Sequence, residues 1–206
     1  MAYVTEQEQF WAGNFGNDYI NRNQSQAYLA SNLNFFSKAL AQVGKPDSLV
    51  ELGANVGMNL RAIQLLFPNI DLFGVEINQQ AAQTLAKAIG TDKVFNGSIF
   101  DFVPPQTFDV ALIKGVLIHI NPDMLPLVYK KLYDASKHYI LVCEYYNPSP
   151  VMVSYRGHQN KLFKRDFAGE LLDQYPDLQL RDYGFVYRRD KAFPQDDVTW
   201  FLLEKR

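Results

Sequence analysis

An acidic residue followed by a glycine-containing turn is the first feature of the sequence that could do chemistry. Glu51 ends a short apolar run, and a turn with Gly53, Asn55 and Gly57 follows it. The two glycines let the main chain adopt positive φ and let a ligand approach the backbone closely, and asparagine tolerates left-handed geometry well. Because an amphipathic run starts at Met58, the stretch predicts a strand, a tight turn and a helix N-terminus. That unit binds nucleotide-like ligands.

The same turn argues against the common phosphate-binding motifs. A dinucleotide fingerprint would place glycines at positions 53, 55 and 58, but Asn55 and Met58 stand at the last two. A P-loop would end in Gly-Lys-Ser or Gly-Lys-Thr, but Gly57 is followed by Met58 and Asn59. The turn therefore suits a ligand whose charge is an amino-acid head group rather than a pyrophosphate.

A second acid, Glu76, ends the next apolar run and lies 19 residues beyond Gly57 (76 − 57 = 19). A carboxylate at this place can accept two hydrogen bonds from a ribose diol; the alternative is a solvated strand end. Together the turn and this acid resemble the class I S-adenosylmethionine-dependent methyltransferases. In that family the stretch from Glu51 to Gly57 would be the first motif, and Glu76 would bind the ribose.

The resemblance implies a cofactor site built from residues at successive strand ends. An acid often follows the third strand in the family, but Ser98 stands there in this chain, and Asp101 is either a substitute or an ordinary loop acid. An N-terminal segment with Tyr19 and Arg22 would fold over the cofactor. The implied cofactor-binding residues are Glu51, Gly53, Ala54, Asn55, Gly57, Glu76, Ile77, Gly97, Ser98, Ile99, Lys114, Gly115, Val116, Tyr19 and Arg22. No metal site is expected.

His119 is the candidate catalytic residue. It lies in the segment from Lys114 to Pro122, which resembles the family segment where a histidine follows a strand and precedes a helix. Its ordinary pKa of about 6.5 leaves much of it neutral at pH 7, so it can act as a general base. The alternative is that His119 only orders the loop.

A connection rich in tyrosine follows the fifth predicted strand and is the candidate acceptor site. Tyrosine faces can stack on a sugar ring, and an arginine can bind a carboxylate with two parallel hydrogen bonds. The alternative is that the tyrosines only cover the sheet edge. The candidate substrate-binding residues are Tyr145, Tyr146, Tyr155, Arg156 and His158.

The elements that must position these residues alternate between strand and helix. A capping box at Thr5 starts a short helix, an ordered loop follows over 11–23, and Ser25 caps a helix that runs to about Val43. Strands are predicted at 48–52, 70–76, 93–96, 108–113 and 138–144, with helices at 57–66, 78–89 and 122–136. A helix at 161–173 then precedes two β runs at 178–189 and 197–204.

This alternation predicts an α/β fold with helices on both faces of a parallel sheet. The resemblance specifies a Rossmann-like class I methyltransferase fold, with a mostly parallel seven-stranded sheet, an antiparallel last strand and N-terminal helices. We expect one methyltransferase domain over 1–206, with an N-terminal helical cap at 1–45 and a Rossmann-like core at 46–206.

Composition fits an ordinary globular protein of 206 residues, with 48% hydrophobic residues and a net charge of −2. The absence of a basic block argues against a nucleic-acid partner. The single cysteine, Cys143, allows no intrachain disulfide or cysteine-rich metal site and suits a reducing cytoplasm. We find no signal peptide and no apolar run long enough for a membrane span, so we expect a cytoplasmic protein. Oligomeric state stays open.

Four segments together resemble the pseudaminic acid biosynthesis-associated methylases of bacteria. These segments are Phe10–Gly16 with Tyr19 and Arg22-Asn23, Lys114–Pro122, Tyr155–His158, and Phe193–Asp197 with Trp200–Lys205. The resemblance implies an S-adenosylmethionine-dependent methyltransferase acting on a small polar acceptor, with an acidic nonulosonic sugar or its nucleotide derivative in surface glycan biosynthesis as a candidate. The alternatives are a nicotinamide-dependent oxidoreductase and a non-catalytic S-adenosylmethionine-binding domain.

Overall fold

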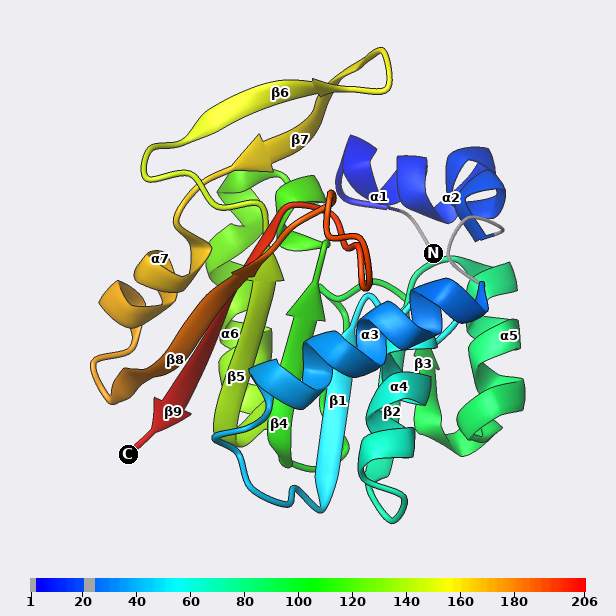
Figure 1. The fold of residues 1–206 in the computed structure, drawn as a ribbon. Coiled ribbons are helices and arrows are strands. Elements are labelled where there is room, and N and C mark those ends of the chain that lie inside the picture. Colours follow the sequence, from blue (N-terminus) through cyan, green and yellow to red (C-terminus); the bar gives the residue numbers. More distant parts are fainter. Residues whose placement is uncertain (1–2, 21–24) are drawn as a thin grey trace.

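The computed structural model describes residues 3–20 and 25–206. Within them, seven strands form one sheet in the order β3-β2-β1-β4-β5-β9-β8 (Figure 1). Strands β1 to β5 are parallel, and β9 is antiparallel to both of its neighbours, β5 and β8. The strands are β1 (Ser48–Leu52), β2 (Asp71–Glu76), β3 (Val94–Asn96), β4 (Phe108–Lys114), β5 (Ser136–Glu144), β8 (Leu178–Val186) and β9 (Val198–Lys205).

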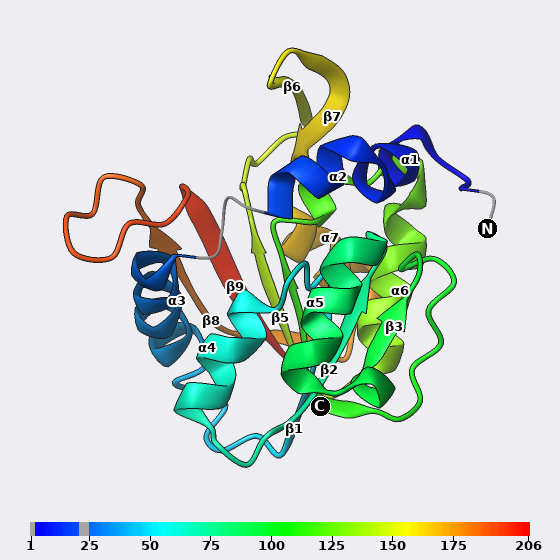
Figure 2. The ribbon, with the colours of Figure 1, turned by 90° about the vertical axis from the view of Figure 1, so that its right-hand side faces the viewer.

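Helices cover both faces of this sheet, and two short helices lie over its upper end (Figure 2). Helices α3, α4 and α5 pack on one face, and α6 and α7 pack on the other. The helices are α1 (Glu6–Ala12), α2 (Asn14–Tyr19), α3 (Gln26–Ala39), α4 (Met58–Leu66), α5 (Gln79–Ile89), α6 (Leu125–Ala135) and α7 (Phe167–Gln174). The predicted fold class, including the antiparallel last strand, is confirmed.

The central strands are buried on both faces, which explains their continuous apolar sequences. In β4, Val110 and Leu112 belong to the core beneath α3 and α4, whereas Ala111 and Ile113 belong to the core beneath α6 and α7. Cys143 in β5 is fully buried. No helix among the described residues is both long enough and apolar enough to span a bilayer.

Several local predictions are confirmed by the caps. The Thr5 side chain accepts a hydrogen bond from the backbone N–H of Glu8, and the Glu8 carboxylate accepts one from the Thr5 N–H, which completes the capping box. Ser25 caps α3, and Gly90 ends α5 with a φ of 105°. Helix α3 ends at Ala39, four residues before the predicted end, because the chain leaves helical geometry at Leu40.

Two predicted elements are wrong. The expected loop at 11–23 contains helix α2, whose aromatic side chains pack on α1; Phe15 stacks on Phe10 with the ring centroids 4.1 Å apart. The expected helix at 161–173 begins only at Phe167. Residues 161–164 belong instead to β7 (His158–Lys164), which pairs with β6 (Val151–Tyr155) in a separate hairpin.

The turn of that hairpin explains the second error. Arg156 and Gly157 connect the paired residues Tyr155 and His158, and their φ values are 52° and 85°. Two consecutive positive φ angles define the type I′ turn that joins two-residue hairpins. The usual first residue there is asparagine or aspartate, so the Arg-Gly pair gave a weak signal in the sequence.

Candidate functional site

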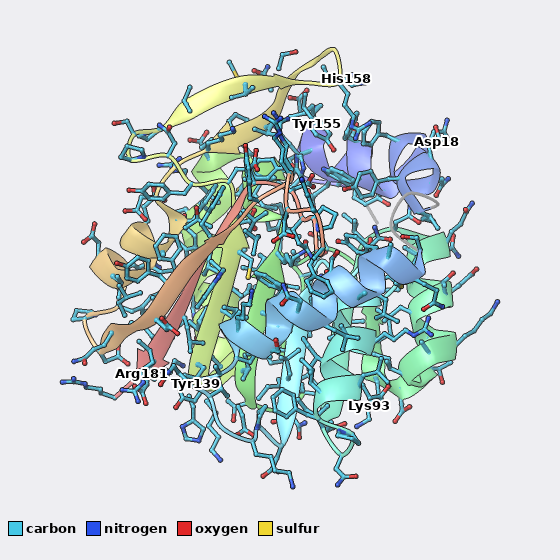
Figure 3. The ribbon with its side chains drawn as sticks, in the orientation of Figure 1. Asp18, Lys93, Tyr139, Tyr155, His158 and Arg181 are labelled. Carbon is cyan, nitrogen blue, oxygen red and sulfur yellow. The ribbon has the colours of Figure 1, made fainter. Side chains whose placement is uncertain are left out.

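A cavity of about 280 Å³ lies at the carboxyl ends of the parallel strands. Its floor comes from the residues that end β1, β2, β4 and β5, and its roof comes from α1, α2 and the β6–β7 hairpin. Tyr155 and His158 of the hairpin lie beside the two N-terminal helices, at the end of the molecule opposite Lys93, Tyr139 and Arg181 (Figure 3). Ligands of open α/β sheets bind at this edge.

The β1–α4 turn has the left-handed geometry that its sequence predicts. Gly53, Asn55 and Gly57 have φ values of 81°, 50° and 83°. The N–H groups of Gly53 and Ala54 donate to the carbonyl of Val75, which holds the turn against the end of β2. A Cβ atom at Gly53 would lie 2.5 Å from Cγ2 of Val116, so this position also needs glycine for space.

Glu51 lies directly beneath the turn and is completely buried. Its Oε1 accepts a hydrogen bond of 2.6 Å from the amide nitrogen of Asn59. Its Oε2 and the Oδ1 of Asn59 are buried without a hydrogen-bond partner among the described residues. Burial raises the pKa of Glu51 from 4.5 to about 8, against the opposing effects of the Asn59 bond and the Lys114 charge.

Glu76 is buried at the end of β2 with its carboxylate held by the backbone. Its Oε1 accepts from the N–H of Asn78 and its Oε2 from the N–H of Asn55, each at 2.7 Å. Burial raises its pKa in spite of these bonds. Because each carboxylate oxygen has a second lone pair, Glu76 can still accept hydrogen bonds from a ligand.

Asn78 connects this acid to the N-terminal helices. Its Oδ1 caps α5 by accepting from the N–H groups of Gln80 and Ala81. Its Nδ2 donates to the carbonyl of Trp11 at 3.3 Å and to Oδ1 of Asn17 at 2.8 Å. The residue that orients Glu76 therefore also ties α1 and α2 to the floor.

Lys114 ends β4 and reaches towards α3. Its Nζ lies 3.4 Å from the Tyr28 hydroxyl and 5.6 Å from the ring centre of Phe35. Burial lowers its pKa, but the charges of Tyr28, Cys143 and Glu51 and the bond to Tyr28 outweigh this effect, so its pKa is raised overall. Lys114 is thus a half-buried cation close to the acid of the first turn.

His119 is held between three elements. Its Nδ1 lies 2.5 Å from the carbonyl of Lys161 in β7; a carbonyl only accepts, so Nδ1 carries the proton and Nε2 is the basic nitrogen. The rings of Trp11 and Tyr155 pack against the imidazole at centroid distances of 4.7 and 4.8 Å. Burial lowers the pKa of His119 from 6.5 to about 4, so the ring is neutral at pH 7.

The two parts of the roof, helix α1 and the hairpin, are bonded to each other as well as to the floor. Nε2 of Gln7 in α1 donates to the carbonyl of Asn160 in β7 at 3.0 Å, and Nζ of Lys161 pairs with Glu6 at 3.1 Å. The ring of His158 packs on Phe10 with centroids 5.0 Å apart. The helices and the hairpin therefore form one cover over the cavity.

Most of the predicted site residues line this cavity. Glu51 lies beneath it, Gly57 contacts α5, and Gly97 packs near Phe95 rather than on the cavity wall. Tyr146 is exposed beside Phe201, His158 belongs to the outer part of the roof, and Arg22 lies outside the described residues. The predicted residues on the wall are Tyr19, Gly53, Ala54, Asn55, Glu76, Ile77, Ser98, Ile99, Lys114, Gly115, Val116, His119, Tyr145, Tyr155 and Arg156.

Sequence reasoning missed several polar residues of the wall. Asn59 lies two residues beyond Gly57, and Asn78 directly follows Ile77. Their short distances in sequence from Glu51 and Glu76 could have marked them as site residues. Glu144 ends β5 just as Glu51 ends β1. Because ligands of open α/β sheets bind at the carboxyl ends of the strands, the same rule could have selected Glu144. Asp196 accepts a hydrogen bond from the Tyr145 hydroxyl, a contact between distant segments that no local pattern reveals.

Comparison with known proteins places this geometry in a fold family. No family model and no curated protein matches the chain. Solved structures do, at low identity. The 1,6-didemethyltoxoflavin-N1-methyltransferase of Burkholderia thailandensis, with bound S-adenosylhomocysteine, is 16% identical with a TM-score of 0.72 over 100% of this chain and 92% of that one.

Two further structures agree. The magnesium protoporphyrin IX methyltransferase of Synechocystis PCC 6803, with bound S-adenosylmethionine, is 8% identical with a TM-score of 0.68 over 100% of both chains. Mitomycin 7-O-methyltransferase is 16% identical with a TM-score of 0.66, and this chain spans 62% of its length. This chain has the class I methyltransferase fold.

The methyltransferase fold differs from that of nicotinamide dehydrogenases in one feature seen directly here. A dinucleotide-binding sheet is mostly parallel and has the order 3-2-1-4-5-6, whereas here the antiparallel strand β9 lies between β5 and β8. Met58, at the position of the third fingerprint glycine, is the first residue of α4.

Proposed function

We propose that the protein is an S-adenosylmethionine-dependent methyltransferase that modifies a small polar acceptor. One observation carries the proposal: buried oxygens of Glu51 and Asn59 have no hydrogen-bond partner at the glycine turn. Unpaired buried acceptors are costly, and an ammonium group supplies three donors. The α-ammonium group of S-adenosylmethionine suits this place.

The other residues of the floor suit the remaining parts of that cofactor. Glu76 has free lone pairs for the ribose hydroxyls, and Lys114 carries the positive charge that a carboxylate needs. Ile77 and Ile99 offer apolar surface for the adenine ring, with Ser98 beside them. The cavity volume of about 280 Å³ is close to the lower end of small-molecule sites, about 300 Å³.

The cofactor supplies an activated methyl group when bound, so the protein's task is alignment and exclusion of water. The cover formed by α1, α2 and the hairpin performs the exclusion. A hydroxyl acceptor would lose its proton to Nε2 of His119, which is neutral at pH 7, although the lowered pKa also makes it a weaker base than ordinary imidazole. An amine or carboxylate acceptor would need no such base.

For the acceptor we propose an acidic sugar of the nonulosonic class or its nucleotide derivative, made for a bacterial surface glycan in the cytoplasm. Arg156 supports this, because it makes no ion pair among the described residues and lies on the cavity wall beside Tyr155, with its guanidinium carbon 5.5 Å from that ring centre. Asp196 and Asp197, two acids that could otherwise pair with Arg156, contact Tyr145 and Arg188 instead. The structural neighbours named above methylate small molecules, which is compatible.

Calorimetry with S-adenosylmethionine and NAD in parallel tests the cofactor. We expect S-adenosylmethionine to bind and NAD not to bind; the reverse would favour the oxidoreductase. Methyl transfer to N-acetylneuraminic acid and its cytidine monophosphate derivative tests the acceptor. Cofactor binding without transfer to any acidic sugar would leave the non-catalytic domain as the better explanation.

Arg156 gives the sharper test of acceptor type. Arg156→Lys should raise the KM for the acidic sugar several-fold and leave cofactor affinity unchanged, because lysine cannot make two parallel hydrogen bonds to a carboxylate. Arg189→Lys, at an exposed arginine between β8 and β9, is the matched control. A drop in melting temperature with normal KM would show that Arg156 stabilises the hairpin instead.

A further inference from the structure

Glu144, at the end of β5, is a buried acid that the scheme above does not use. It is 2% exposed. Its Oε1 accepts hydrogen bonds from the N–H groups of Val116 and Leu117, both at 2.9 Å. Those donors open the 3₁₀ turn Leu117–His119, whose first N–H groups have no partner within the turn. The carboxylate therefore binds the turn that carries the candidate base.

The other carboxylate oxygen is also significant. Oε2 of Glu144 is buried and has no hydrogen-bond partner among the described residues, and the side chain borders the cavity. A carboxylate held at one oxygen only can bind a proton or a ligand donor at the other oxygen, and a proton there weakens the hydrogen bonds that the first oxygen accepts from the turn. The charged and titratable groups that face it are Lys114 of β4, Cys143 of β5, Tyr129 of α6, and Arg165, which borders a small hollow next to Glu144.

We propose that Glu144 is a positioning residue, which fixes the turn after β4 and so holds His119 over the cavity. The backbone N–H of His119 bonds to the carbonyl of Val116 at 2.8 Å, so a movement of Val116 is passed directly to His119. Lys161 holds the imidazole from the opposite side. The histidine is thus fixed by β5 through its main chain and by the hairpin through its side chain.

The negative charge of Glu144 strengthens this hold. Hydrogen bonds to an ionised carboxylate are about twice as strong as neutral ones, and an anion is favoured where a helical turn begins. Burial raises the pKa of Glu144 from 4.5 to about 7, although the N–H groups of the turn oppose the rise. Near pH 7 the turn is therefore held tightly in one protonation state and loosely in the other.

The link between Glu144 and the turn can be measured without knowing the acceptor. In nitrogen–proton correlation spectra recorded from pH 5 to pH 9, the amide signals of Val116 and Leu117 should move with a common midpoint near 7. In Glu144→Gln, an isosteric change, they should be independent of pH over that range. The pKa of His119 should rise in that variant from about 4 towards 6.5, because a released ring gains water.

Glu204→Gln is the matched control. Glu204 also accepts a hydrogen bond, from the Tyr139 hydroxyl at 3.3 Å, and it pairs with Arg181, but it lies outside the cavity. Its replacement should leave the Val116 and Leu117 titration as in the wild type. Identical titration in Glu144→Gln and wild type would overturn the proposal.

Two further measurements keep the result interpretable. If Glu144→Gln fails to fold, the carboxyl carbon signal of Glu144 in the wild type must share the midpoint of the two amides, and a different midpoint would reject the proposal. The role of Glu144 in methyl transfer rests on the proposed function. Calorimetry separates the two ideas: absence of S-adenosylmethionine binding by the wild type would end the proposed function, whereas the titration would still report on the turn.

Discussion

Replacing Glu51 by glutamine should stabilise the protein at alkaline pH and leave its stability at acid pH nearly unchanged. Burial raises the pKa of this carboxyl from 4.5 to about 8. Below pH 4.5 the group is protonated in the folded and in the unfolded chain. Between pH 4.5 and pH 8 the unfolded chain releases the proton and the folded chain keeps it. Folding stability contributed by Glu51 is therefore complete below pH 4.5 and is lost as the pH rises to 8.

The size of this effect follows from the two pKa values. Each pH unit of difference corresponds to about 1.4 kcal/mol. Across the window from 4.5 to about 8, Glu51 should therefore account for on the order of 5 kcal/mol of lost stability. Glutamine keeps the shape of the side chain, and its carbonyl oxygen can still accept the 2.6 Å bond from Asn59. The variant removes the ionisation and little else.

Urea denaturation of both proteins at pH 5, 7 and 9 tests this prediction. The difference in unfolding free energy between Glu51→Gln and wild type should grow in favour of the variant with each step. Asp173→Asn, at an exposed acid of α7, should show no such growth. A Glu51→Gln difference that is constant from pH 5 to pH 9 would refute the reasoning, because it would mean that the buried carboxyl does not titrate in this window.

Three other substitutions address the cofactor site. Gly53→Val should abolish S-adenosylmethionine binding, measured by calorimetry, because its φ of 81° and the 2.5 Å approach to Val116 leave no place for a branched side chain. Glu76→Ala should weaken that binding in a folded protein, by about 1.5–3 kcal/mol for each charged hydrogen bond lost; unchanged affinity would remove the ribose role. Asn78→Ala should lower the stability by about 1 kcal/mol, because the cap of α5 is lost. The variant should also be cleaved faster by protease at α1 and α2. In the wild type, added cofactor should slow that cleavage.

The fold could be predicted because its strands are short, apolar and separated by helices with clear caps. The run from Ser48 to Leu52 was placed correctly to the residue, and the left-handed turn after it follows from glycine and asparagine. The hairpin could not be predicted in this way. Its turn uses Arg156, which takes positive φ only at a cost, so the residue type conceals the conformation. The boundary proposed at residue 45 between cap and core stays a prediction.

The site was predictable where it follows strand ends and unpredictable where distant segments meet. Glu76 was found because it ends a strand 19 residues beyond the glycine turn, and His119 because its segment resembles the one that follows a strand in the methyltransferase family. The carbonyl of Lys161 that sets the tautomer of His119, and the Trp11 ring that covers it, come from segments 42 and 108 residues away. No spacing rule in the sequence relates such segments, because the hairpin and the N-terminal helices meet only through the tertiary fold.

The acids of the site oppose folding, and this property agrees with a cationic ligand. Glu51, Glu76 and Glu144 are buried at the ends of β1, β2 and β5, and burial raises the pKa of each. Apolar residues of similar size would pack there without that cost. A ligand that carries both a sulfonium and an ammonium charge would offset the cost when it binds, whereas the product left after methyl transfer has lost the sulfonium charge. The three buried acids thus favour the charged cofactor over its neutralised product. The same burial lowers the stability of the free protein at neutral pH, so stability is given up for this binding preference.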